Sequence, residues 1–283
     1  METSKDFLTI LENNFIKWAE TQDDIRAVII FGSRARNILN ADKWSDTDFM
    51  VYAINIKQYI HKNEWLNNVG NVLISLVNLS FLNQPGISTL FEDGKSIDFF
   101  FQSVNELENI NKTHTLPFAF HRGFKIILDK DNLSKQFHHF QKNDQLFFPP
   151  SQEMFIRNVN MYWYQAYYIA KQLFRNELWH VKMRDAYLKE SLLIMVQWHA
   201  GIKSNWSKDV WHMGKFINKW ADNFVLEKLD TLFGHYDLND SWNALFACNN
   251  LFGQLAHKVA EQLKYSYPDD IEGTVSQLIR SKL

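Results

Sequence analysis

Cysteine is almost absent from this chain, because Cys248 is the only one in 283 residues. A single cysteine excludes an intrachain disulfide and a zinc site built from several thiolates. Apolar runs long enough to cross a bilayer are also missing, and residues 1–6 lack the basic start and apolar run of a signal peptide. We therefore expect a cytoplasmic protein without a membrane partner.

The chain also lacks an excess of one charge, since its formal net charge is only −2. Without a strongly basic surface, we expect no nucleic-acid partner, although a pocket for a few phosphates needs only a few cations. Hydrophobic residues make up 46% of the chain and include 23 Phe and 10 Trp. This composition predicts a folded protein with a substantial core rather than a disordered chain.

The pattern of apolar residues changes once, at Phe147-Phe148-Pro149-Pro150. Before this break short apolar runs indicate strands, and after it only long helical periodicities remain. We predict an α+β protein, with an α/β domain containing a mixed sheet over residues 1–148 and an α-helical bundle domain over residues 149–283. Predicted strands are 27–31, 49–54, 89–91, 97–101 and 124–128; predicted helices begin at Thr3 or Ser4 and near Asn132, and span 56–69, 151–175, 184–200, 210–221 and 240–264. Residues 72–82 are apolar and fit either element.

A glycine-serine turn and a pair of acids follow the first predicted strand. Gly32-Ser33 ends the strand, and Asp46 and Asp48 come shortly afterwards. Residues two apart in a strand project from the same face, so both carboxylates converge, and such a pair suits Mg²⁺ carrying substrate phosphates. Glycine lets the backbone approach a phosphate. A turn or helix cap is the simpler alternative for an isolated Asp-x-Asp pair, but the sequence around it indicates a metal-dependent nucleotide site.

This arrangement resembles the polymerase-β-like nucleotidyltransferase superfamily. In that superfamily a third carboxylate comes from a neighbouring strand, and here Asp98 lies within Ser96-Ile97-Asp98-Phe99-Phe100, on the strand that leaves a predicted Asp93-Gly94 hairpin. An acid inside such an apolar strand needs a partner. A metal ion shared with Asp46 and Asp48 would supply it.

Further segments resemble the aminoglycoside 6-adenylyltransferases, in family order over nearly the whole chain. The chain departs from the family at Phe31, at Ala35-Arg36 and in the Asp-Thr-Asp pair, which leaves the metal chemistry intact. The matching segments are Gly32-Ser33-Arg34, Leu90–Gly94, Leu128–Asp131, Lys171–Glu177, Trp198-His199, Met213-Gly214-Lys215 and Lys264–Asp269.

The resemblance implies transfer of AMP from ATP, with Mg²⁺, to a hydroxyl of a streptomycin-like aminoglycoside, and antibiotic resistance as the result. Asp46 and Asp48 would hold the metal, and Asp98 would complete the metal site or act as the base. The resemblance also implies that the nucleotide phosphates contact Gly32, Ser33, Arg34, Lys171, Arg175 and Lys215. The polycationic acceptor would lie in a cleft between the domains and contact Glu92, Glu177 and Asp185.

Simpler roles compete for several of these residues. Lys171 and Arg175 also fit a solvated helix face, Glu92 a turn and Asp185 an ordinary surface position. Two other functions stay open: a nucleotidyltransferase for another acceptor (a lincosamide, another small molecule or a protein), and a non-catalytic nucleotide-binding regulator. We expect a monomer or a homodimer.

Overall fold

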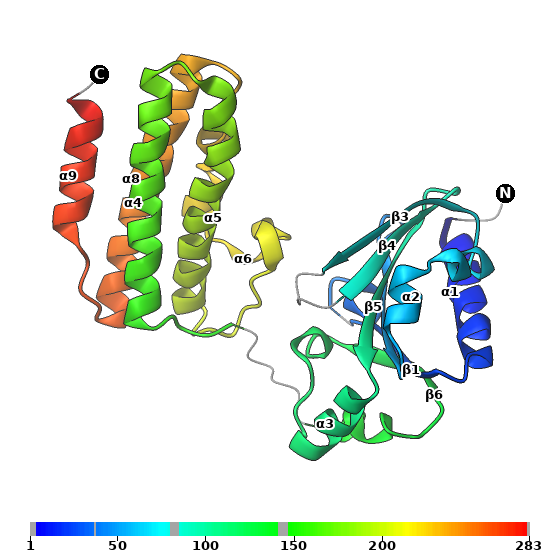
Figure 1. Cartoon of the computed structure of the whole chain (residues 1–283). Coiled ribbons are helices and arrows are strands. Elements are labelled where there is room, and N and C mark those ends of the chain that lie inside the picture. Colours follow the sequence, from blue (N-terminus) through cyan, green and yellow to red (C-terminus); the bar gives the residue numbers. More distant parts are fainter. Residues whose placement is uncertain (1–3, 37, 80–84, 141–146, 282–283) are drawn as a thin grey trace. The chain divides into compact units, whose positions relative to one another are not determined.

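The computed structural model (Figure 1) describes residues 4–36, 38–79, 85–140 and 147–281. The chain forms two compact units, Met1–Asn143 and Asp144–Leu283, called here the N-terminal and C-terminal units. The division falls five residues before the expected boundary at 148. The reason lies in Phe147, whose ring lies 5.3 Å from that of Trp206 and packs against the core of the C-terminal unit.

A mixed six-stranded sheet organises the N-terminal unit, in the order β3-β4-β5-β2-β1-β6. Strands β2 and β5 pair in parallel and the other neighbours pair antiparallel. The predicted α+β class is confirmed, and the ambiguous segment 72–82 forms a strand as far as Leu79, with residues 80–82 outside the described part. The strands are β1 (Ile25–Phe31), β2 (Thr47–Ala53), β3 (Val72–Leu79), β4 (Pro85–Phe91), β5 (Ser96–Ser103) and β6 (Phe124–Asp129).

Side chains alternate along the central strands, so the sheet has two different buried faces. Helix α1 (Ser4–Thr21) covers one face, where the Phe15 ring lies 4.7 Å from both Phe49 and Phe99. Helix α3 (Asn105–Thr113) packs on the other face, where it shares a buried cluster with Met50 of β2 and Phe100 of β5. Since Asp48 and Asp98 alternate with Phe49 and Phe99, burial of the two rings against α1 turns both carboxylates to the opposite face.

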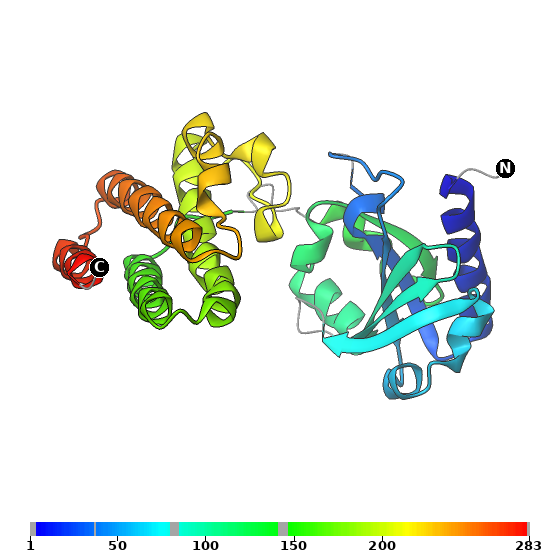
Figure 2. The ribbon, with the colours of Figure 1, turned by 90° about the horizontal axis from the view of Figure 1, so that it is seen from above.

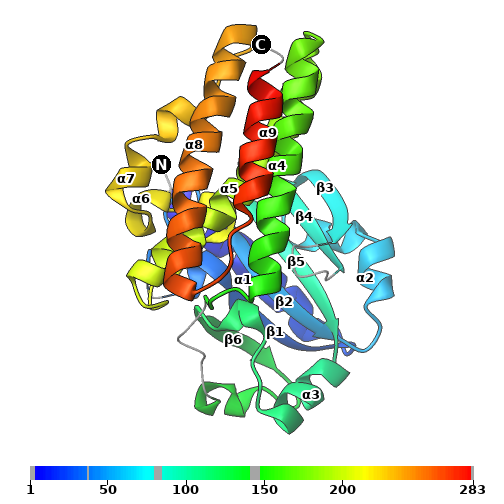
Figure 3. The ribbon, with the colours of Figure 1, turned by 90° about the vertical axis from the view of Figure 1, so that its left-hand side faces the viewer.

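The C-terminal unit is a helical bundle. Helix α4 packs against α5, α8 and α9, and α5 packs against α8 (Figures 1 and 3). Figure 2 looks along these helices. The predicted helices 151–175, 184–200 and 240–264 are confirmed, with α5 beginning earlier. The helices are α4 (Gln152–Phe174), α5 (Leu178–Lys203), α6 (Ile217–Trp220), α7 (Asn223–Leu226), α8 (Leu238–Leu263) and α9 (Asp269–Arg280).

Three predicted helices are wrong in extent. Residues 56–69 form only α2 (Lys57–His61) and a 3₁₀ turn (Glu64–Asn68), because the backbone at Lys62 is extended. The segment from Asn132 forms a 3₁₀ turn (Lys135–His139), since Asn132 itself is left-handed (φ 59°). Residues 210–221 break into a 3₁₀ turn and α6, with left-handed backbone at Met213 and Phe216.

Among the described residues, no helix combines the length and apolar character needed to cross a membrane.

Candidate active site

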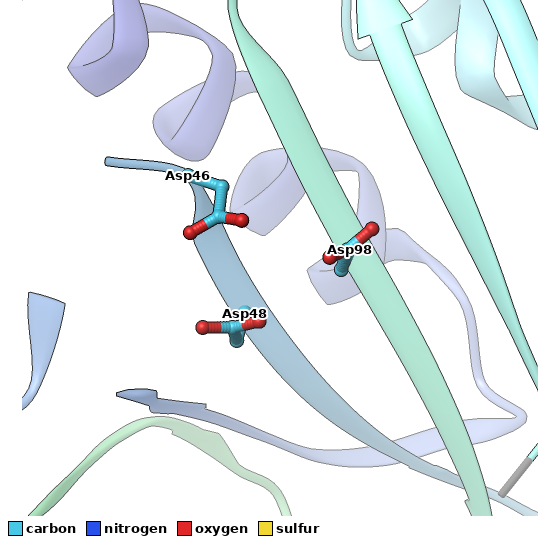
Figure 4. A group of neighbouring side chains, drawn as sticks. All are labelled: Asp46, Asp48 and Asp98. Carbon is cyan, nitrogen blue, oxygen red and sulfur yellow. The ribbon is translucent and has the colours of Figure 1, made fainter. Parts of the chain in front are cut away.

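Three carboxylates meet at one end of the central strands of the N-terminal unit (Figure 4). Asp46 immediately precedes β2, Asp48 lies in β2, and Asp98 pairs in register with Asp48 from the parallel strand β5. One oxygen from each carboxylate lies within 4.8 Å of the others, and all three residues are partly buried. The structure thus brings together the three acids predicted as a metal site.

Burial makes this cluster electrostatically unfavourable on its own. The pKa of Asp98 is raised above its ordinary value, chiefly by burial and also by the negative charge of Asp46, while a hydrogen bond with Ser88 acts in the opposite direction. The charged form of Asp98 therefore lacks sufficient compensation from the protein groups around it. A nearby cation would provide that compensation.

The cluster fits Mg²⁺ by the chemistry of its donors. Carboxylate oxygens are hard ligands, and Mg²⁺ in nucleotide enzymes is commonly bound through one or two carboxylates plus substrate phosphates. Asp46, Asp48 and Asp98 offer such oxygens within 4.8 Å of one another. These three residues are therefore the ones that would hold the ion.

The glycine-serine turn lies directly beside the cluster. Gly32 begins a 3₁₀ turn after β1 with φ +70°, and a Cβ at this position would lie 2.1 Å from Oδ2 of Asp48. Only glycine allows this close approach of backbone and carboxylate. Ser33 is buried, and its hydroxyl donates a hydrogen bond of 3.3 Å to the carbonyl oxygen of Asp46, which ties the turn to the start of β2.

The structure gives Arg34 a protein partner that the sequence did not predict. Its Nε lies 2.5 Å from Oε1 of Glu12 in α1, and the Thr47 hydroxyl donates to the same carboxylate over 2.6 Å. Glu12 thereby connects α1, the glycine-serine turn and β2. The only sequence signal for this role is an acid placed on the apolar side of the first helix, close to Leu11 and Phe15.

Two of the predicted basic residues lie close to the α4–α5 turn of the C-terminal unit. Lys171 is half-buried in α4, with its Nζ 5.2 Å from the centre of the Tyr168 ring. Arg175 is exposed immediately after α4, and Glu177 is exposed immediately before α5. Within the family-like segment 171–177, Arg175, Asn176 and Glu177 are exposed polar residues, while Gln172 and Leu173 are buried.

Lys215 does not lie beside these two cations. It follows Gly214, where an added Cβ would lie 3.5 Å from Leu193 of α5. Leu193 is fifteen residues after Leu178, about 22 Å along α5 at 1.5 Å per residue. The expectation that Lys215 reaches the same anion as Lys171 and Arg175 is therefore not supported by the geometry of this unit.

The two remaining predicted acids have partners. Asp185 forms an ion pair with Lys189, one turn further along α5. Glu92 is exposed at the β4–β5 turn, and its Oε2 accepts a 3.1 Å hydrogen bond from Nδ2 of Asn71. To bind a substrate amine, Asp185 would have to release Lys189, and Glu92 would have to release Asn71.

Replacing Asp98 by asparagine should stabilise the metal-free protein at neutral pH. A raised pKa means that the folded state prefers protonated Asp98, so wild-type stability falls as pH rises through that pKa, whereas asparagine suffers no such loss. In EDTA we expect the Tm of Asp98→Asn to exceed wild type by a few degrees at pH 7.5, and the gap to narrow as pH falls toward 4. Thermal scans across pH test this, with the exposed-acid variant Asp93→Asn as control. A gap that stays constant with pH would contradict it.

The chain matches known proteins over nearly its full length. The sequence profile of the streptomycin adenylyltransferase family matches residues 1–281. An aminoglycoside 6-adenylyltransferase of Bacillus subtilis (strain 168) is 26% identical over 270 residues, covering 92% of each chain. One of Campylobacter jejuni is 27% identical over 296 residues, covering 100% of this chain and 96% of the relative. The crystal structure of an aminoglycoside 6-adenyltransferase from Bacillus subtilis aligns with 100% of this chain and 99% of its own, at 21% identity and a TM-score of 0.47.

The profile match spans both units, and the acids, glycine and serine that resemble the family in sequence lie together in the N-terminal unit. The chain therefore belongs to the streptomycin adenylyltransferase family and is a nucleotidyltransferase.

Proposed function

We propose that this protein transfers AMP from Mg-ATP to a hydroxyl of a streptomycin-like aminoglycoside, releases pyrophosphate and thereby confers resistance to the drug. The observation that carries the proposal is the convergence of Asp46, Asp48 and Asp98 beside Gly32. It occurs in a chain that matches the streptomycin adenylyltransferase profile over residues 1–281. A nucleotide co-substrate follows from membership of that family.

The reaction is a substitution at the α-phosphorus of ATP. The acceptor oxygen forms a bond to phosphorus, the bond from phosphorus to the α,β-bridging oxygen breaks, and pyrophosphate leaves with the electron pair. The hydroxyl proton passes to a base. Attacking and leaving oxygens lie roughly in line, so catalysis depends chiefly on positioning and on compensation of charge.

Each residue of the N-terminal site has a part in this scheme. Asp46 and Asp48 would hold the metal, and Asp98 would complete the set of ligands. Mg²⁺, when bound, supplies positive charge to the phosphate oxygens. Asp98 is the candidate base because it lies beside Asp46 and Asp48, within reach of a hydroxyl that attacks at the metal site. The backbone of Gly32 would contact the β- and γ-phosphates, and Ser33 would do so on exchanging its hydrogen bond with the Asp46 carbonyl.

Residues of the C-terminal unit would complete recognition. Lys171 and Arg175 suit phosphate binding, since they lie four residues apart at the end of α4, about one helical turn. Glu177, exposed next to them, is the stronger candidate for a substrate amine. Asp185 and Glu92 are weaker ones, because Asp185 is ion-paired and Glu92 is hydrogen-bonded in the structure.

The proposal is tested by pyrophosphate release with Mg-ATP and a panel of aminoglycosides and lincosamides. We expect release that depends on streptomycin and is lost in Asp46→Ala/Asp48→Ala. Release with lincosamides alone would keep the chemistry and change the acceptor. No release across the panel, with ATP still bound, would exclude the antibiotic-modifying function and favour a regulator or another acceptor.

A further inference from the structure

A cavity of about 500 Å³ lies in the N-terminal unit between the sheet and α3. Its floor is formed by Met50 and Tyr52 of β2 and Gln102 of β5, and α3 and residues 115–119 form its walls. The volume lies within the range of small-molecule sites. None of the residues assigned above to catalysis or phosphate binding lines it.

The cavity lies on the same face of the sheet as the three carboxylates. Asp48, Met50 and Tyr52 are successive same-face residues of β2, and Asp98 and Gln102 lie on that face of β5. Strand residues rise about 3.3 Å each, so Met50 lies about 7 Å along the strand from Asp48. The glycine-serine turn follows Phe31, which pairs with Asp48. Because β1 and β2 are antiparallel, the turn lies beyond the Asp48 end of the row Asp48, Met50 and Tyr52, away from the cavity. Asp48 and Asp98 therefore lie between the glycine-serine turn and the cavity.

Tyr52 presents a buried polar group to this cavity. The residue is only 1% exposed, and no hydrogen bond of its hydroxyl is found among the residues that the structure describes. Burial, and secondarily the charge of Glu106, raise its pKa well above the ordinary value, so the phenol stays protonated and able to donate. The phenol lines the cavity, where it can donate a hydrogen bond to an oxygen of a ligand.

The rest of the lining indicates what kind of ligand fits. Gln102 and Asn109 offer amide donors and acceptors, and Phe118 offers an exposed apolar surface. The hydroxyls of Thr113 and Thr115 donate to backbone carbonyls and leave their oxygens as acceptors. Among the described residues of the lining, Glu106 is the one that carries a charge, while Arg122 lies over the Phe118 ring at 5.4 Å without lining the cavity. A phosphate would meet an acid and no cation among these residues. A polyol carrying a positive charge would find hydroxyl partners, an apolar wall and a counter-charge.

We propose that this cavity holds one sugar ring of the cationic, hydroxyl-rich acceptor. The inference rests on the proposed function, because it deepens the identity of the acceptor site. In-line transfer requires the acceptor hydroxyl to approach phosphorus from the side opposite to the leaving pyrophosphate. With the β- and γ-phosphates at Gly32 and Ser33, the opposite side is that of Met50 and Tyr52. The acceptor ring in the cavity then places its hydroxyl toward Asp48 and Asp98.

The test compares steady-state kinetics of full-length variants in pairs on α3. Glu106→Gln removes the charge in the lining, and its control Glu108→Gln removes one outside it. Asn109→Trp fills the cavity from an exposed helix position, and its control Asn105→Trp adds the same bulk elsewhere. We expect Glu106→Gln to raise KM for streptomycin roughly fivefold, because an ion pair between Glu106 and the substrate would be exposed to solvent. We expect Asn109→Trp to raise the same KM at least about tenfold. KM for ATP and the kinetics of both controls should change less than twofold.

Other outcomes would overturn the inference. A rise in KM for ATP instead of streptomycin would make the cavity a nucleoside site, and unchanged constants in both variants would exclude it from substrate binding. If the wild-type protein modifies no aminoglycoside, the proposed function fails. Calorimetric titration of the full chain with streptomycin then tests separately whether the cavity binds the drug. Binding weakened by Asn109→Trp would support it, and wild type without binding would contradict it.

Discussion

Replacing Asp48 by asparagine should lower kcat/KM for adenylyl transfer at least about a thousandfold. Asp48 lies at the centre of the site, paired in register with Asp98 and beside Gly32. Asparagine keeps the shape but replaces one carboxylate oxygen by an amide nitrogen and removes the charge that holds the metal. Removal of a single group that stabilises transition-state charge lowers rates by about 10²–10³, and loss of a metal ligand should have a larger effect. Pyrophosphate release under saturating Mg-ATP measures it.

Two controls separate catalysis from folding. The Tm of Asp48→Asn in EDTA should be at least that of wild type, because one of three crowded acids has been neutralised. Asp93→Asn, an exposed acid in the β4–β5 turn, should retain full activity. Activity of Asp48→Asn within tenfold of wild type would show that the three acids are not the catalytic site.

Gly32→Ala should produce the second large effect, a loss of roughly a hundredfold or more in kcat/KM. The added Cβ would lie 2.1 Å from Oδ2 of Asp48, so either the carboxylate or the turn has to move. Displacement of a catalytic group by about 1 Å commonly lowers rates on the order of a hundredfold. KM for ATP should rise as well, because the same turn faces the phosphates in the proposed mechanism.

Gly94→Ala is the matched control for backbone strain. Gly94 has φ +78°, close to the +70° of Gly32, but an added Cβ there would have no atom within 4 Å. Both substitutions impose the left-handed penalty of roughly 1 kcal/mol, and only Gly32→Ala also creates the collision. Equal effects on activity would mean that strain, rather than the approach to Asp48, explains the loss.

The centre of the site was predictable from the sequence because strand geometry is regular. Asp48 and Asp98 each interrupt an apolar run, and the period of two places them on the face opposite Phe49 and Phe99. The Asp93-Gly94 hairpin also predicted the direction in which β5 leaves β4. Local rules therefore sufficed where neighbouring residues determine the geometry.

Helix extents were predicted less well, since apolar periodicity continues through breaks in the backbone. Asn132, Met213 and Phe216 adopt left-handed conformations that end or prevent a helix, although the pattern around them remains helical. At the first of these breaks, the Asp129 carboxylate accepts hydrogen bonds from the backbone N–H groups of Leu133 and Ser134 and holds a turn instead. Such side-chain competition depends on one residue and leaves the periodicity unchanged.

Partners distant in sequence were beyond what spacing predicts. Arg34 binds Glu12 of α1, which lies 22 residues earlier, so a residue expected to contact phosphate already has an ion-pair partner. Lys215 lies far from the α4–α5 turn, because the preceding Gly214 packs beside Leu193, well along α5. The cavity at Tyr52 combines strands with a helix and a loop more than fifty residues later, and no motif marks it.

The mass of streptomycin after incubation with the enzyme, ATP and Mg²⁺ tests the central claim most directly. We predict that the product gains one adenylyl group and that pyrophosphate forms in equal amount, with neither product formed by Asp46→Ala/Asp48→Ala. Streptomycin that stays unmodified while the folded wild-type protein binds ATP, or that gains a phosphoryl group instead, would contradict this account.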